Sequence, residues 1–129
     1  MKRIAIATAC GVVAGLVCVS IGASLGVAIT LTTFGWAMLN RTLLGFVIGI
    51  SALRLHWAGH GILMGAIVGT LFSYSLFMAG DPIWLAGGVL VGSMVFGFLI
   101  ELFTTLVFKQ PQQELIGAAE AEIPKRAAA

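Results

Sequence analysis

Glu101, His60, His56 and Arg54 have side chains capable of acid–base chemistry, and they lie within or beside long apolar segments. Burying a lone carboxylate in an apolar environment is costly, so such residues usually face the inside of a helix bundle and have a partner. We therefore expect Glu101 to point inward and to form a hydrogen bond with a residue between Arg54 and His60. This intramembrane polar cluster could be a structural contact or a proton- or cation-handling site. Alternatively, Glu101 could lie exposed in a projecting helix end.

His56 and His60 are one helical turn apart, a spacing at which two imidazoles can share a metal ion. A third ligand could come only from Glu101, Cys10 or Cys18, and two histidines do not make a site. We expect solvated histidines beside Trp57, with no metal, haem or other cofactor.

Motifs for catalysis are missing from the sequence. It contains no HExxH or Walker loop and no pair of carboxylates suited to hydrolysis. Its net charge of +2 comes from scattered basic residues, which argues against nucleic-acid binding. The sequence therefore predicts neither an enzyme nor a nucleic-acid partner.

Small residues recur every four positions in the second half of the chain. We expect these helix-packing residues to be Gly61, Gly65, Gly69 and Ser73 on one helix, and Ser93 and Gly97 on the next. The first half has the same spacing at Gly11 and Gly15, and at Gly45 and Gly49. Because small residues let membrane helices approach closely, this glycine-zipper pattern predicts tight packing. The face of Gly61, Gly65 and Gly69 should be the closest helix contact, made either within the chain or with a second copy.

The elements that carry these residues are predicted to cross a membrane. The chain has 129 residues, 60% hydrophobic and 9% charged, and a small soluble domain cannot bury that much apolar surface. We expect an all-α integral membrane protein whose four helices cover approximately residues 4–23, 37–56, 57–79 and 83–108. Residues 1–109 would form the transmembrane domain and residues 110–129 a polar cytoplasmic tail. No sequence repeat is apparent, and an inverted pairing of the two halves stays open.

The second helix is the hardest to place. Trp and Arg often mark the membrane interface, so Trp36 near Arg41 suggests that residues 24–36 form an outer connection. That connection could be a loop, an interfacial helix or a re-entrant segment, and one long helix is the alternative. Arg41 and Asp81 would then lie near the outer surface and could form a weak ion pair. Asp81 is also expected to cap the fourth helix.

Basic residues indicate the orientation. Lys2, Arg3, Arg54, Lys109, Lys125 and Arg126 all fall on one predicted side of the membrane. Because basic residues accumulate in cytoplasmic loops, both termini are expected in the cytoplasm. The N-terminal segment resembles a signal peptide, but we expect an uncleaved first helix in a bacterial or archaeal plasma membrane.

Two functions fit these features. The first is a structural or accessory helix-packing subunit, in contact with the lipid bilayer and either homo-oligomeric or part of a larger membrane complex. The alternative is a small transporter or channel for protons, cations or a small solute, with Glu101 and His60 in its polar site. A redox or metal-binding membrane protein is a more distant third.

Overall fold

The computed structural model describes residues 2–51, 53 and 55–109, and it consists of four long helices there. They are α1 (Lys2–Ser24), α2 (Leu31–Ile50), α3 (Trp57–Ala79) and α4 (Ile83–Leu102), which continues as a π-helical turn, η1 (Phe103–Val107). All four are long and apolar enough to cross a membrane. The predicted all-α, multi-pass membrane fold is therefore confirmed. The predicted tail lies outside the described residues.

Three helices lie close to their predicted positions, but the second does not. The range 37–56 is wrong, because α2 begins at Leu31 and ends at Ile50. Thr30 caps its N-terminus by accepting a hydrogen bond from the Thr33 backbone N–H at 3.2 Å. Capping by Thr satisfies one of the free N–H groups of the first turn. Residues 31–36, which the sequence analysis assigned to an outer connection, are therefore the first residues of α2.

The turn between α3 and α4 has the predicted position and a different cap. Gly80 ends α3 in the left-handed conformation, with φ of 85°, which glycine adopts without strain. The N-cap of α4 is Pro82 rather than Asp81, because the Pro82 carbonyl accepts hydrogen bonds from the backbone N–H groups of Leu85 and Ala86.

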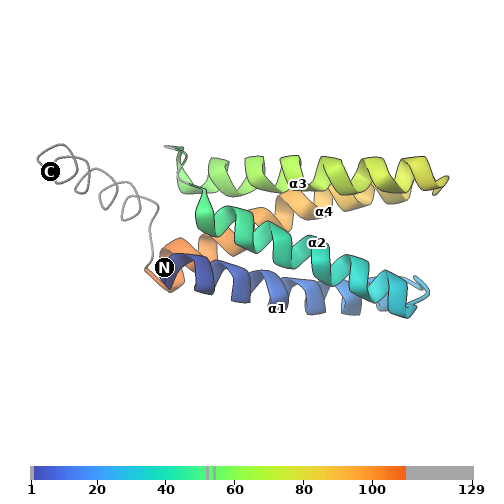
Figure 1. The fold of residues 1–129 in the computed structure, drawn as a ribbon, viewed down its shortest axis with the longest axis horizontal. Helices are drawn as coiled ribbons and strands as arrows, with labels where there is room; N and C mark the ends of the chain where they lie inside the picture. Colours follow the sequence, from blue (N-terminus) through green and yellow to red (C-terminus); the bar gives the residue numbers. More distant parts are fainter. Residues whose placement is uncertain (1, 52, 54, 110–129) are drawn as a thin grey trace, which may run out of the picture.

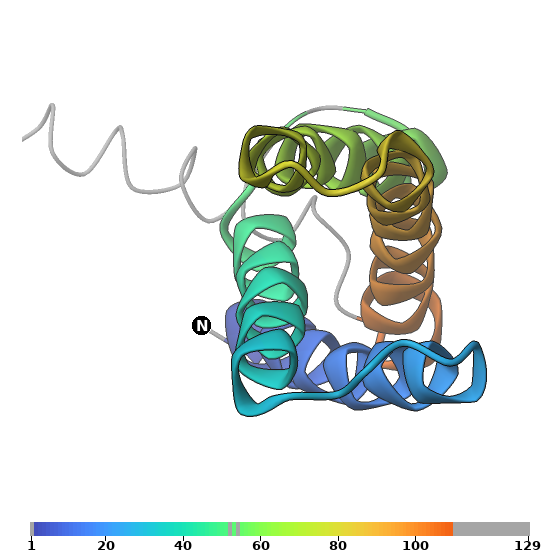
Figure 2. The ribbon, with the colours of Figure 1, turned by 90° about the vertical axis from the view of Figure 1, so that its right-hand side faces the viewer.

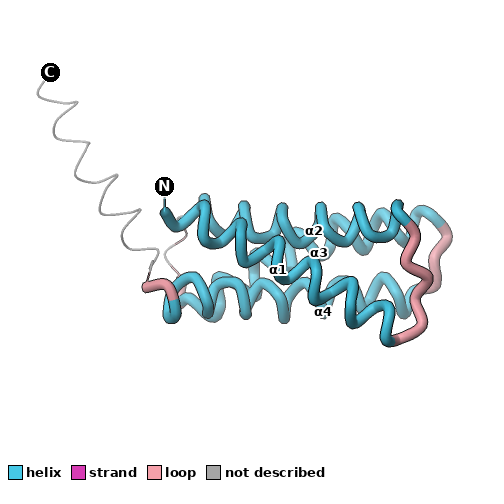
Figure 3. Tube along the Cα trace, turned by 90° about the horizontal axis from the view of Figure 1, so that it is seen from below, coloured by secondary structure: helices cyan, strands magenta, loops and turns pink. Residues whose placement is uncertain are grey.

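The four helices form two helical hairpins, α1–α2 and α3–α4 (Figure 1). Seen along the long axis of the bundle, they lie around the sides of a rough square (Figure 2). The connections within both hairpins lie at one end of the molecule, and α1 begins at the opposite end (Figure 3). The hairpins run in the same direction, so the two halves are parallel repeats rather than inverted ones.

Small residues bring the two helices of each hairpin into backbone contact. A Cβ atom added to Gly65 would lie 2.7 Å from the Met94 Cα atom, and one added to Gly11 would lie 2.5 Å from the Arg41 carbonyl oxygen. The predicted glycine face of α3 therefore packs against α4 of the same chain. It is one of two such interfaces, because α1 and α2 approach each other equally closely at Gly45 and Ala7.

The two glycine-lined interfaces have matching registers. Residues 7, 11 and 15 of α1 correspond to residues 61, 65 and 69 of α3, and residues 41, 45 and 49 of α2 correspond to residues 93, 97 and 101 of α4. Arg41 and Glu101 depart from this small-residue pattern. Arg41 corresponds to Ser93 of the other hairpin, and Glu101 corresponds to Gly49. Both lie in the interface between the hairpins.

Candidate functional site

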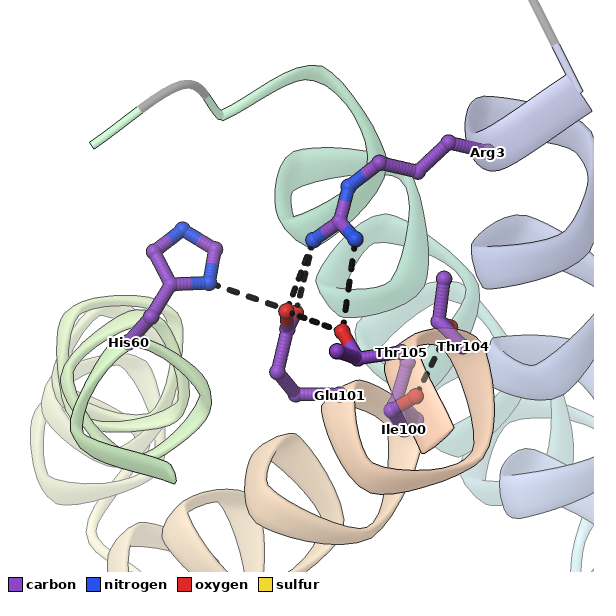
Figure 4. A network of polar contacts seen from close by, with 6 residues as sticks. All are labelled: Arg3, His60, Ile100, Glu101, Thr104 and Thr105. Carbon is purple, nitrogen blue, oxygen red and sulfur yellow. Dashed lines mark hydrogen bonds and ion pairs between the residues drawn. The ribbon is translucent and has the colours of Figure 1, made fainter. Parts of the chain in front are cut away.

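Glu101 lies at the centre of a buried polar cluster that joins the two hairpins (Figure 4). The Arg3 Nη2 atom donates to both carboxylate oxygens, at 2.8 Å and 3.0 Å. His60 approaches from α3, and its Nδ1 atom lies 3.2 Å from Oε2. An ionised carboxylate only accepts hydrogen bonds, so we assign the ring proton to this nitrogen. Glu101 and His60 have no exposed surface, and Arg3 is 3% exposed.

The π-helical turn η1 places a fourth member beside this carboxylate. The Thr105 hydroxyl donates to Glu101 Oε1 at 2.9 Å and lies 3.4 Å from Arg3 Nη1, which donates to it. A π-type hydrogen bond from the Phe108 N–H to the Phe103 carbonyl, at 2.9 Å, closes the turn. Such turns inside α-helices often occur at functional sites. Here the turn completes the shell of donors around Glu101.

The structure brings only some of the predicted cluster residues together. Glu101 and His60 are together, and Arg54 lies outside the described residues. His56 precedes the first residue of α3, where its exposed ring lies beside Trp57 with 5.4 Å between the ring centroids. His56 and His60 therefore do not share one helix face. Within residues 2–51, 53 and 55–109, no group of three His, Cys, Asp or Glu side chains could hold a metal ion.

Arg3 is the member of the cluster that the sequence analysis missed. It was read as a flanking cytoplasmic charge, but it belongs to the first turn of α1 and is buried. A usable signal existed, because Arg3 and Glu101 both lie near the same predicted membrane surface. A basic side chain at the depth of a buried acid is a natural partner.

A second polar cluster surrounds Arg41, which was expected at the outer surface. Arg41 is instead 3% exposed and lies about halfway along α2. Its Nη1 atom donates to the Ser93 hydroxyl at 2.7 Å, and its Nη2 atom donates to the Cys18 sulfur at 3.6 Å. The guanidinium carbon lies 4.6 Å from the centroid of the Phe96 ring, a cation–π contact. The expected ion pair with Asp81 is wrong, because the true start of α2 moves Arg41 into the bundle.

The remaining predicted packing residues lie between α3 and α4. The Ser73 hydroxyl donates to the Ala86 carbonyl at 2.7 Å, as expected for a small polar residue at this interface. A Cβ atom at Gly69 would meet Ser93 Cβ at 2.7 Å, and one at Gly61 would meet the Gly97 carbonyl at 2.6 Å. All six predicted packing residues thus face the partner helix within the chain.

An apolar cavity of about 300 Å³ lies between α1 and the α4–η1 helix. Cys10, Val13, Val17, Phe96 and Phe103 are among its lining residues. The interface between the hairpins therefore combines two polar clusters with a buried apolar core, and this pocket opens at its edge.

Comparisons with protein-family models, curated proteins and solved structures found no match, so the geometry alone carries any conclusion about function.

Proposed function

We propose that this protein is a structural or accessory helix-packing subunit that associates in the membrane with further copies or with a larger complex. The observation that carries the proposal is a set of glycines on its outer surface. Gly35, Gly87 and Gly88 lie within helices, yet a Cβ atom added to any of them would have no atom of the described residues within 4 Å apart from its chain neighbours and its own helix backbone.

These outer glycines pack against no other helix in the described part of the chain. Glycine inside a helix is about 1 kcal/mol less favourable than alanine. At Gly11 and Gly65 the close approach of a neighbouring helix offsets that cost. Gly35 and Gly87 occupy corresponding positions in the two hairpins. Each has an exposed apolar side chain nearby in the sequence, Leu31 for Gly35 and Trp84 for Gly87. A helix from outside the chain could approach such a surface closely.

The buried carboxylate favours a structural role over transport. Both oxygens of Glu101 accept hydrogen bonds, and its side chain has no exposed surface. A transport site must exchange its ion or proton with water on each side. A carboxylate held by Arg3, His60 and Thr105 in a closed cluster is better suited to fixing helices together. Proton or cation transport through Glu101 and His60 is therefore the less favoured alternative.

The test is the size of the native complex. The full chain should be extracted in mild detergent, and its molar mass and co-purifying proteins measured. We expect a complex larger than one chain, and Gly88→Leu should reduce its size while the variant stays folded. Val91→Leu, on the same exposed part of α4, is the matched control and should leave the size unchanged. A parent protein that runs as a single chain with no partner would refute the proposal.

For the orientation, we infer that both termini are cytoplasmic. Lys2 begins α1 and Lys109 follows η1, at the same end of the bundle, and basic residues favour the cytoplasmic side. Arg3 adds little to this signal because it is engaged with Glu101. Reporter fusions after Lys109 and in the Asp81–Pro82 turn should report cytoplasm and exterior respectively. A cytoplasmic signal from the turn would contradict the inference.

A further inference from the structure

Arg41 is a buried cation whose contacts among the described residues are with the neutral side chains of Ser93, Cys18 and Phe96. Ten residues separate it from Leu31 and nine from Ile50, so it lies about 14–15 Å from each end of α2. Its hydrogen-bond partners are a hydroxyl and a thiol, and its Nε atom is buried without a hydrogen bond. A charge at this depth is costly to insert into a membrane. A site that keeps such a charge calls for a counter-charge.

No carboxylate of the described part of the chain supplies that counter-charge. The two acidic residues there are Asp81 and Glu101. Glu101 lies eight residues beyond Ser93, about 12 Å along α4, and is bound to Arg3. Asp81 lies twelve residues before Ser93, in the turn that precedes α4.

The side chains next to Arg41 can donate further hydrogen bonds. The Ser93 hydroxyl accepts from Arg41, which leaves its own O–H available to donate. The Cys18 sulfur also accepts from Arg41, and its S–H is a weak donor. Gly92 lies against the guanidinium, because a Cβ atom there would be in van der Waals contact with Arg41 Nη2, at 3.4 Å. A cation surrounded by free donors is chemically complementary to an anion.

We propose that Arg41, Ser93 and Cys18 bind a small inorganic anion, such as chloride, between the two hairpins. The buried position limits the size of the ion, and it lies too deep for a lipid phosphate. Three helices supply the ligands, since Cys18 belongs to α1, Arg41 to α2 and Ser93 to α4. Because Arg41 and Ser93 occupy corresponding positions in the two repeats, the site lies where equivalent parts of the hairpins meet. The bound ion would neutralise Arg41 and strengthen the contact between them.

Chloride itself is the probe for this proposal. The thermal unfolding of the full-length protein should be followed in a neutral detergent while chloride replaces gluconate at constant ionic strength. An ion that binds only the folded state raises the unfolding temperature with the logarithm of its concentration once that concentration exceeds the dissociation constant. We expect the unfolding temperature to rise by about 4 °C when the chloride concentration is roughly tenfold above its dissociation constant.

Three variants separate this site from general salt effects. Arg41→Met should abolish the chloride response, and Ser93→Ala should shift it to higher chloride concentration. Lys2→Met removes an exposed cation instead and should respond as the parent does. If Arg41→Met does not fold, equilibrium dialysis of the parent and Ser93→Ala with radiolabelled chloride provides the same comparison.

Two results would overturn the proposal. One is an unfolding temperature independent of chloride, together with no saturable chloride binding to the parent protein. That outcome would leave a carboxylate of another chain as the counter-charge of Arg41. The other is an unchanged chloride response in both Arg41→Met and Ser93→Ala, which would place the bound ion elsewhere.

Discussion

The interfaces within the hairpins and the interface between the hairpins are built from different residues. Within each hairpin, glycines such as Gly11 and Gly65 let two backbones touch. Between the hairpins, long charged side chains make polar contacts beside a buried apolar core that includes Leu44, Met64 and Ile100. Lipid is as apolar as a helix surface, so hydrophobic burial does not hold membrane helices together. Backbone contact joins the two helices of each hairpin here, while directed polar contacts and buried apolar side chains join the two hairpins.

The largest effect is expected at the interface between hairpins, from Glu101→Leu. This change leaves Arg3 buried without its carboxylate, and breaking a buried ion pair from one side costs about 3–5 kcal/mol. The free energy of unfolding in detergent measures the loss. Glu101→Gln keeps a carbonyl that can accept from Arg3, so its cost should be lower, about 2 kcal/mol. Equal losses for the two variants would show that the hydrogen bonds to Arg3 and His60 contribute little.

A slightly smaller effect is expected within a hairpin, from Gly65→Leu. Its Cβ atom alone would overlap the Ser93 carbonyl oxygen and the Met94 backbone, so α3 and α4 must separate. Such overpacking costs about 3 kcal/mol. Ile67→Leu is the control, since Ile67 is 49% exposed and its volume is unchanged. Thermal unfolding of both variants beside the parent makes the comparison. A Gly65→Leu variant as stable as the parent would exclude backbone contact at this glycine.

The smallest effect is expected for Ser73→Ala, which removes one hydrogen bond between α3 and α4. Hydrogen bonds between membrane helices average about 0.6 kcal/mol, so the free energy of unfolding should fall by about that amount. Ser75→Ala is matched to it, because the Ser75 hydroxyl donates to the Phe72 carbonyl of its own helix and is exposed. If Ser75→Ala costs as much as Ser73→Ala, the loss comes from the substitution itself and not from the contact with Ala86.

The same contrast explains which parts of this structure could be predicted. Hydropathy and the Gly80–Pro82 turn were sufficient to place α3 and α4, because lipid imposes a helix length and glycine and proline end a helix. The four-residue spacing of small residues indicated the contacts within hairpins, because it depends only on the geometry of one helix. Sequence alone therefore predicts the features that depend on a single helix or a single hairpin.

The contacts between the hairpins could not be predicted, because they join residues that are far apart in the sequence. Arg3 and Glu101 are 98 residues apart in the chain, and only the assembled bundle brings them within hydrogen-bond distance. Arg41 was misplaced because a six-residue error at the start of α2 moved it from the middle of a helix to the membrane surface. Thr30 could have corrected this error, since a threonine before an apolar helix is a typical N-cap.

A double-mutant cycle on Arg3 and Glu101 tests most directly the central claim that their buried ion pair helps to hold the two hairpins together. It compares the free energy of unfolding of the parent, Arg3→Met, Glu101→Leu and the double variant. Each single change removes the oppositely charged member of this ion pair from the charge that remains, while the double change removes both charges. We therefore expect the double variant to be more stable than the sum of the single losses predicts, by about 2 kcal/mol. Losses that add to within about 0.5 kcal/mol would contradict the claim, because independent residues behave in that way.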